Sequence, residues 1–143
     1  MAKVIAIDYG NKRVGLAVTD ELQIIATRLT SIHSKDVISY LTEFVLNNKV
    51  ETMVIGKPVN LRGEDTDSSE VIKNFTKHLI KKFPTINVVE IDERFTSKMA
   101  SQAIAQSGMS KKKRQNKGLI DQVSAVIILQ DYLKRRDFEK GKI

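Results

Sequence analysis

Three acidic residues that are far apart in the chain lie at the end of, or inside, strongly apolar segments. They are Asp8 in VIAIDYGNKRVGLAV, Glu93 in VVEIDERFTS and Asp121 in GLIDQVSAVIIL. An unpaired carboxylate in such surroundings costs several kcal/mol of desolvation. Carboxylate oxygens are the ligands that Mg²⁺ or Mn²⁺ prefers, and bound divalent ions assist phosphodiester hydrolysis. The three acids therefore predict a divalent-metal site that acts on a polyanion.

Two of these acids also have a simpler structural interpretation. Asp8 precedes the Gly10-Asn11 pair and could hydrogen-bond the amides of a turn. Asp121 is expected in the first turn of a helix, where the helix dipole favours an acid by ~0.3–1 kcal/mol. That effect explains why an acid is tolerated at position 121, but it supplies no partner for Asp121 on its helix face.

Cations and glycine accompany the acids. Gly10 could bring the backbone close to a phosphate, or it could simply serve a tight turn. Arg94 directly follows Glu93 and can grip a phosphate or balance the acidic cluster. The residues expected to contact nucleic acid are Lys12, Arg13, Lys57, Asn60, Arg94, Lys111, Lys112, Lys113, Arg114 and Lys117.

Composition agrees with a polyanionic partner. The 143 residues carry a formal net charge of +7, and phosphate neutralisation dominates affinity for nucleic acids. The chain has no cysteine, which excludes disulfides, thiolate zinc sites and a cysteine nucleophile. No apolar run approaches the ~18 residues of a membrane span, and no signal peptide is apparent. We expect a cytoplasmic protein that binds nucleic acid and no membrane, as a monomer or a homodimer.

The hydrophobic pattern predicts an α/β fold. Residues 3–9 and 14–19 form a hairpin with Asp8 near its tip, and residues 24–32 form a third strand. Further strands are expected over residues 52–56 and 87–91. Helices are expected over residues 37–46 after Ser34 as an N-cap, 71–80, 96–107 and 119–136.

This order predicts a hairpin-led, mixed five-stranded sheet with an antiparallel second strand and helices on both faces. We expect a single domain over residues 1–143 with a frayed tail from about residue 137. In open α/β sheets, ligands gather beyond the carboxyl ends of the parallel strands. Asp8 and Glu93 are both expected there.

With these residues in hand, the chain resembles the YqgF family, also called RuvX, of ribonuclease-H-like proteins. The resemblance covers nearly the whole chain and rests on four blocks: IAIDYGNKRVGLAVTD, VIGKPVNLRG, IDERFTS and GLIDQVSAVIILQDYL. The family's acidic positions fall on Asp8, Glu93 and Asp121. In the second block, Lys57 replaces the hydrophobic residue that usually stands between the glycine and the proline.

The resemblance implies an RNase H-like fold and an endonuclease that depends on Mg²⁺ or Mn²⁺ and acts on structured RNA or DNA. Such proteins are described as nucleases that mature the 5′ end of precursor 16S ribosomal RNA, which we favour, or as Holliday junction resolvases acting on DNA. Two other classes are alternatives: a catalytically silent RNA-binding module, and a nucleotide-binding phosphotransferase. The phosphotransferase is disfavoured because actin-like ATPases enclose ATP between two lobes, and this chain supplies one.

Overall fold

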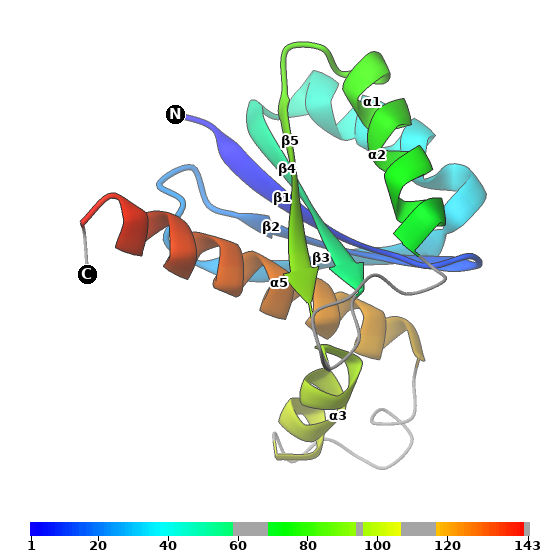
Figure 1. Cartoon of the computed structure of the whole chain (residues 1–143), viewed down its shortest axis with the longest axis vertical. Helices are drawn as coiled ribbons and strands as arrows, with labels where there is room; N and C mark the ends of the chain where they lie inside the picture. The colour runs from blue at the N-terminus through cyan, green and yellow to red at the C-terminus, as the bar shows by residue number, and fades with distance from the viewer. Residues whose placement is uncertain (59–68, 94–95, 107–116, 142–143) are drawn as a thin grey trace.

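A computed structural model describes residues 1–58, 69–93, 96–106 and 117–141, which form an α/β fold around one mixed sheet (Figure 1). The strands are β1 (Lys3–Tyr9), β2 (Arg13–Thr19), β3 (Ala26–His33), β4 (Val50–Pro58) and β5 (Asn87–Glu93). They are arranged in the order β3-β2-β1-β4-β5. The central strand β1 is antiparallel to β2 and parallel to β4, and β5 is parallel to β4. The predicted five-stranded sheet with an antiparallel second strand is confirmed.

Helices cover both faces of this sheet, as the sequence predicted (Figure 1). They are α1 (Val37–Asn47), α2 (Ser69–Lys82), α3 (Thr96–Gln106) and α5 (Lys117–Glu139). One face carries α1 and α2, and the other carries α5, which crosses β1, β2 and β3. The shorter helix α3 packs against α5.

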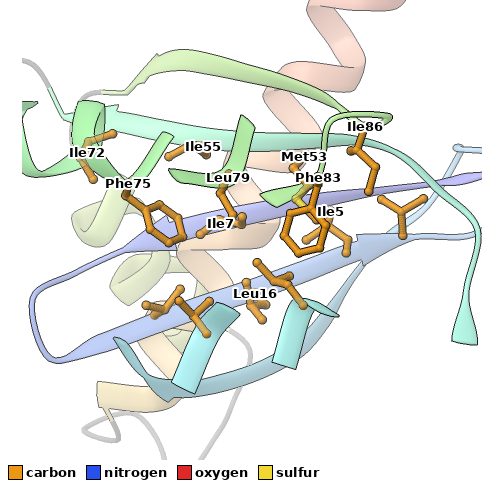
Figure 2. Packing of buried hydrophobic residues seen from close by; sticks show 14 residues of the cluster. Ile5, Ile7, Leu16, Met53, Ile55, Ile72, Phe75, Leu79, Phe83 and Ile86 are labelled. Atoms are coloured by element: carbon orange, nitrogen blue, oxygen red, sulfur yellow. The ribbon is translucent and has the colours of Figure 1, made fainter. Parts of the chain in front are cut away.

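Alternation along the strands divides the core into two layers. On β1, Ile5 and Ile7 belong to the cluster beneath α1 and α2, which Figure 2 shows from close by. Val4 and Ala6 instead belong to the cluster beneath α5. Complete burial of an isoleucine or leucine contributes ~1.5–3 kcal/mol. A one-residue slip would exchange the two faces of the strand, so these clusters fix the register of β1 and with it the position of Asp8.

Element boundaries differ from the sequence prediction where functional residues lie. β5 extends to Glu93, so this acid is the last residue of the strand rather than a residue beyond it. Helix α5 begins at Lys117, two residues earlier than predicted, and has no acid in its first turn. The helix-dipole explanation for Asp121 is therefore wrong. The helix also continues through Glu139, past the position where fraying was expected.

The predicted N-cap of α1 is also wrong. A short 3₁₀ helix over Ser34–Asp36 precedes α1, and the residue at the N-cap position is Asp36. Ser34 turns instead toward the β1–β2 hairpin, where its hydroxyl donates to the carbonyl of Asn11. Within the described residues, no helix combines the length and apolar character that a bilayer crossing requires.

Candidate active site at the end of the β1–β2 hairpin

Asp8 stands on the side of β1 that faces α5. Val4 and Ala6, four and two positions earlier, pack in the α5 cluster, and side chains alternate between faces along a strand. Asp8 is half-buried and pairs in register with Gly15 of β2. The apolar strand therefore carries this carboxylate to the point where α5 passes over the hairpin.

Gly15 brings Asp121 to the same point. A Cβ added to Gly15 would lie 2.9 Å from the Cβ of Asp121 and closer still to the backbone carbonyl of Asp121. A glycine inside a strand often marks such a close approach of another backbone. Ala17, the next residue of β2 on this face, is also small and fully buried beneath α5. These small residues let α5 lie close to the sheet, with Asp121 above the register partner of Asp8.

The turn between β1 and β2 is closed by its own backbone. The Gly10 N–H donates to the Arg13 carbonyl at 2.9 Å, and a Cβ on Gly10 would lie 2.7 Å from that oxygen. The turn interpretation of Gly10 thus has a direct structural basis. Ser34, the first residue of the 3₁₀ helix after β3, holds the tip of the turn. Its hydroxyl donates to the Asn11 carbonyl at 2.6 Å and its N–H donates to the Lys12 carbonyl at 3.0 Å.

Asp8 and Asp121 line one open pocket of about 250 Å³. The other residues around it come from the turn and from the strand ends on either side of it: Tyr9, Gly10, Asn11, Lys12 and Arg13. Tyr9 anchors this turn to the opposite layer, because its ring stacks on Phe75 of α2 with centroids 4.0 Å apart. Two carboxylates from opposite ends of the sequence thus share a solvent-accessible pocket with two cations.

Asp121 was expected to have no partner on its helix face, and that prediction is wrong. Arg13 Nε donates to Asp121 Oδ2 at 2.7 Å, across 108 residues of sequence. The Asp121 side chain is 19% exposed and the Arg13 side chain is 45% exposed. The ion pair therefore lies at the wall of an open pocket, where both groups remain within reach of solvent.

The other predicted site residues are described only in part. Glu93 pairs in backbone register with Pro58 at the end of β4, and its side chain lies outside the described part of the structure. Lys57 is half-buried on β4, and Lys117 is exposed as the first residue of α5. The remaining predicted contacts lie outside the described residues: Asn60, Arg94, Lys111, Lys112, Lys113 and Arg114.

Three residues that help to form the site were not predicted to be site residues: Tyr9, Asn11 and Ser34. Gly15 carried a readable signal, because an isolated glycine within a strand pattern indicates close backbone approach. The contact of Ser34 spans 23 residues and has no local pattern that could reveal it.

The donor set fits a hard divalent cation. Mg²⁺ is commonly held by one or two carboxylates together with substrate phosphate oxygens, and Asp8 and Asp121 supply two such groups. Among the described residues, no three histidine, cysteine, aspartate or glutamate side chains gather into a metal-binding group. The side chain of Glu93 lies outside these described residues.

Known proteins are similar to this chain over nearly its whole length. A family model described as RuvX, Holliday junction resolvase, matches residues 2–135. A protein of Flavobacterium johnsoniae named "Putative pre-16S rRNA nuclease" is 50% identical over 138 residues, covering 96% of this chain and 100% of that protein. Proteins of the same name are 48% identical in Flavobacterium psychrophilum and 45% identical in Christiangramia forsetii. These cover 95% and 93% of this chain, and 99% and 98% of their own lengths.

Fold and relatives together define an RNase H-like protein of the nuclease class. The chain belongs to the RuvX family. The family resemblance, the fold class and the assignment to the nucleases are therefore confirmed.

Proposed function

We propose that this protein is a divalent-metal-dependent endonuclease whose site is formed by Asp8, Asp121 and Glu93. The observation that carries the proposal is the convergence of Asp8 and Asp121 in one open pocket at the hairpin end of the sheet. Glu93 is included because it ends β5 and because it matches the family's acidic position. Bound Mg²⁺ or Mn²⁺ would supply Lewis-acid stabilisation of the charge that develops on the phosphate oxygens.

The residues of the chain itself hold the reactants in place. Asp8 is positioned by the buried strand β1, and Asp121 is positioned by the contact of α5 with Gly15. Lys12 is exposed at the tip of the turn and Arg13 lies beside it, so both can approach a phosphate that enters the pocket. An arginine fork suits bidentate phosphate recognition, whereas a lysine acts as a point charge. The turn therefore orients the nucleic-acid strand, while the acids face the phosphodiester bond that is cleaved.

We propose precursor 16S ribosomal RNA as the substrate and the cytoplasm as the site of action. The relatives that match 93% or more of this chain are named as pre-16S rRNA nucleases, and these names support this choice. A net charge of +7 agrees with a large polyanion. The description of the matching family model favours a second candidate substrate, a four-way DNA junction. Cutting both strands of a junction would favour a two-fold dimer, whereas processing of ribosomal RNA imposes no such symmetry.

The test is cleavage of a precursor 16S transcript by the full chain, with Mg²⁺ and with EDTA, beside a four-way DNA junction. We expect metal-dependent cleavage of the RNA and its loss, by more than about 100-fold, in Asp8→Asn. Asp20→Asn is the matched control, because Asp20 is a half-buried acid on the turn at the other end of β2, away from the pocket that Asp8 and Asp121 line. Cleavage that persists in EDTA or in Asp8→Asn would refute the metal mechanism. Cleavage of the DNA junction but not of the RNA would show that the junction, rather than precursor 16S RNA, is the substrate.

A further inference from the structure

We infer that Arg13 is a counter-ion that competes with the divalent cation for Asp121 and that metal binding releases it toward the substrate phosphate. This inference rests on the proposed function and deepens it. Its starting observation is the 2.7 Å ion pair between Arg13 Nε and Asp121 Oδ2 inside the pocket that Asp8 also lines. The arginine occupies an oxygen that the same pocket would offer to a metal.

The two partners differ in how far they can move. Asp121 sits on a helix that is fixed by buried residues one and two turns further on, including Ala125 and Ile128, and by the contact with Gly15. The backbone of Arg13 is fixed by its bond to Gly10, but its side chain is long and 45% exposed. The guanidinium is therefore the part of the pair that can leave, while the carboxylate stays in place.

A divalent metal ion and a guanidinium disfavour each other's binding to the same carboxylate. They repel each other, and each is stabilised by the same negative charge. Once displaced, a guanidinium remains charged and has a complete set of donors for a phosphate. Metal loading would thus convert Arg13 from a partner of Asp121 into a substrate contact, which links metal binding to RNA binding.

A purely structural role makes the opposite prediction. If Arg13 mainly clasps the turn to α5, then its removal loosens Asp121 and metal binding weakens. If Arg13 competes with the metal, its removal frees Asp121 and metal binding tightens. The sign of the change in affinity therefore separates the two roles.

The experiment measures the affinity of the full chain for Mn²⁺ by electron paramagnetic resonance at about 0.15 M salt, where distant charges are largely screened. We expect Arg13→Ala to bind Mn²⁺ about twofold to fivefold more tightly, which corresponds to the usual strength of partly exposed ion pairs. With Mn²⁺ bound, the same variant should bind a short, non-cleavable precursor 16S fragment more weakly than the wild type does. In EDTA, where Arg13 pairs with Asp121, this difference should become smaller.

Arg135→Ala is the matched control. It removes one arginine from an exposed ion pair on the same helix α5, in which Arg135 lies 3.0 Å from Asp131. Arg135 is about 21 Å along the helix from Asp121, so the control should leave Mn²⁺ affinity unchanged. Arg13→Gln removes the charge but keeps an N–H donor and more of the aliphatic side chain than alanine does, and it should tighten binding as Arg13→Ala does. It serves if the alanine variant does not fold.

The outcomes separate this inference from the proposed function. Weaker or unchanged Mn²⁺ binding in both Arg13 variants would overturn the competition, even if Asp8→Asn abolishes Mn²⁺ binding and so supports the metal site. Absence of Mn²⁺ binding in the wild type would overturn both. Tighter binding in the Arg13 variants, with Arg135→Ala unchanged, is the result that supports competition.

Discussion

β2 has a turn at each end, and the long helix α5 reaches both turns through an arginine. At the site end, Arg13 of the turn pairs with Asp121 of the helix. At the remote end, Arg136 of the helix donates to the side-chain oxygen of Gln23 in the turn, and it also pairs with Asp137 at 3.0 Å. The same kind of side chain thus joins the same helix to the same strand at two places.

The surroundings of the two arginines differ. Arg136 is 15% exposed and also lies over the ring of Tyr132, 6.0 Å from its centroid. Gln23 in turn donates to the carbonyl of Ala2 at 2.8 Å. Arg13 is three times as exposed, and its ion pair borders a pocket. The remote arginine is packed into a network of side chains, whereas the arginine at the site borders an open pocket.

The remote turn is also hydrogen-bonded by its own acid. Asp20 Oδ1 accepts the N–H groups of Ile24 at 2.9 Å and Ile25 at 2.8 Å. Asp8, at the opposite end of the sheet, lines the pocket with Asp121. The acids at the two turns therefore differ in their position relative to this pocket.

The largest effect is expected from adding a side chain at Gly15, where α5 lies against β2 at the site end. Gly15→Ala places a methyl group 2.9 Å from the Cβ of Asp121 and closer to its carbonyl, so the helix must shift. Displacement of a catalytic group by about 1 Å can cost 10²-fold in rate, and overpacking costs about 1–3 kcal/mol. Cleavage assays and urea unfolding should show both losses.

Gly141→Ala is the control for that substitution, because a Cβ at Gly141 meets no atom within 4 Å. Its positive φ of 70° makes alanine strained there, but the position lies beyond α5, so we expect cleavage to be unchanged. Full activity in Gly15→Ala would show that the close approach does not position Asp121.

A smaller effect is expected from removing one hydrogen-bonding side chain at each turn. Ser34→Ala removes the hydroxyl that holds the Asn11 carbonyl, and Gln23→Ala removes the side chain that joins Ala2 and Arg136. Each hydrogen bond contributes about 0.5–1.5 kcal/mol. We expect Ser34→Ala to lower kcat/KM several-fold and Gln23→Ala to lower only the free energy of unfolding. Equal effects on kcat/KM would erase the distinction between the two turns.

The smallest effect concerns the pH dependence of stability. The N–H groups of Ile25 and Ile24 lower the pKa of Asp20 below its ordinary value of 3.8. A depressed folded-state pKa stabilises the fold above the unfolded pKa, and that contribution disappears as the pH falls through the folded pKa. Between pH 7 and pH 3, the urea midpoint of the wild type should therefore fall more than that of Asp20→Asn. Parallel curves would show that these hydrogen bonds contribute nothing.

Much of the fold was predictable because the relevant signals are local. The apolar alternation of β1, the turn glycine at position 10 and the small residues of β2 define the hairpin and place Asp8 at its end. The three acids could be identified as unusual from their apolar context and from the family blocks. Convergence of Asp8 and Asp121 follows once α5 is known to cross β2.

The contacts at the site were less predictable, because long side chains choose partners in three dimensions. Arg13 has a cationic neighbour in sequence, Lys12, and gave no sign that it would pair with Asp121. Ser34 has the residue type of an N-cap, but the short 3₁₀ helix moves the start of α1 and directs its hydroxyl to the hairpin. The start of α5 lay two residues from the predicted position, which was enough to misplace Asp121 relative to the helix dipole.

The most direct test of the proposed site is paramagnetic broadening of backbone amide signals by Mn²⁺. We expect the signals of residues 8–13 and of Asp121 to broaden at low Mn²⁺ concentration, those of residues 20–25 to stay sharp, and the effect to vanish in Asp8→Asn. Broadening at residues 20–25 instead, or at residues 8–13 regardless of the substitution at Asp8, would contradict the assignment of Asp8 and Asp121 to a shared metal site.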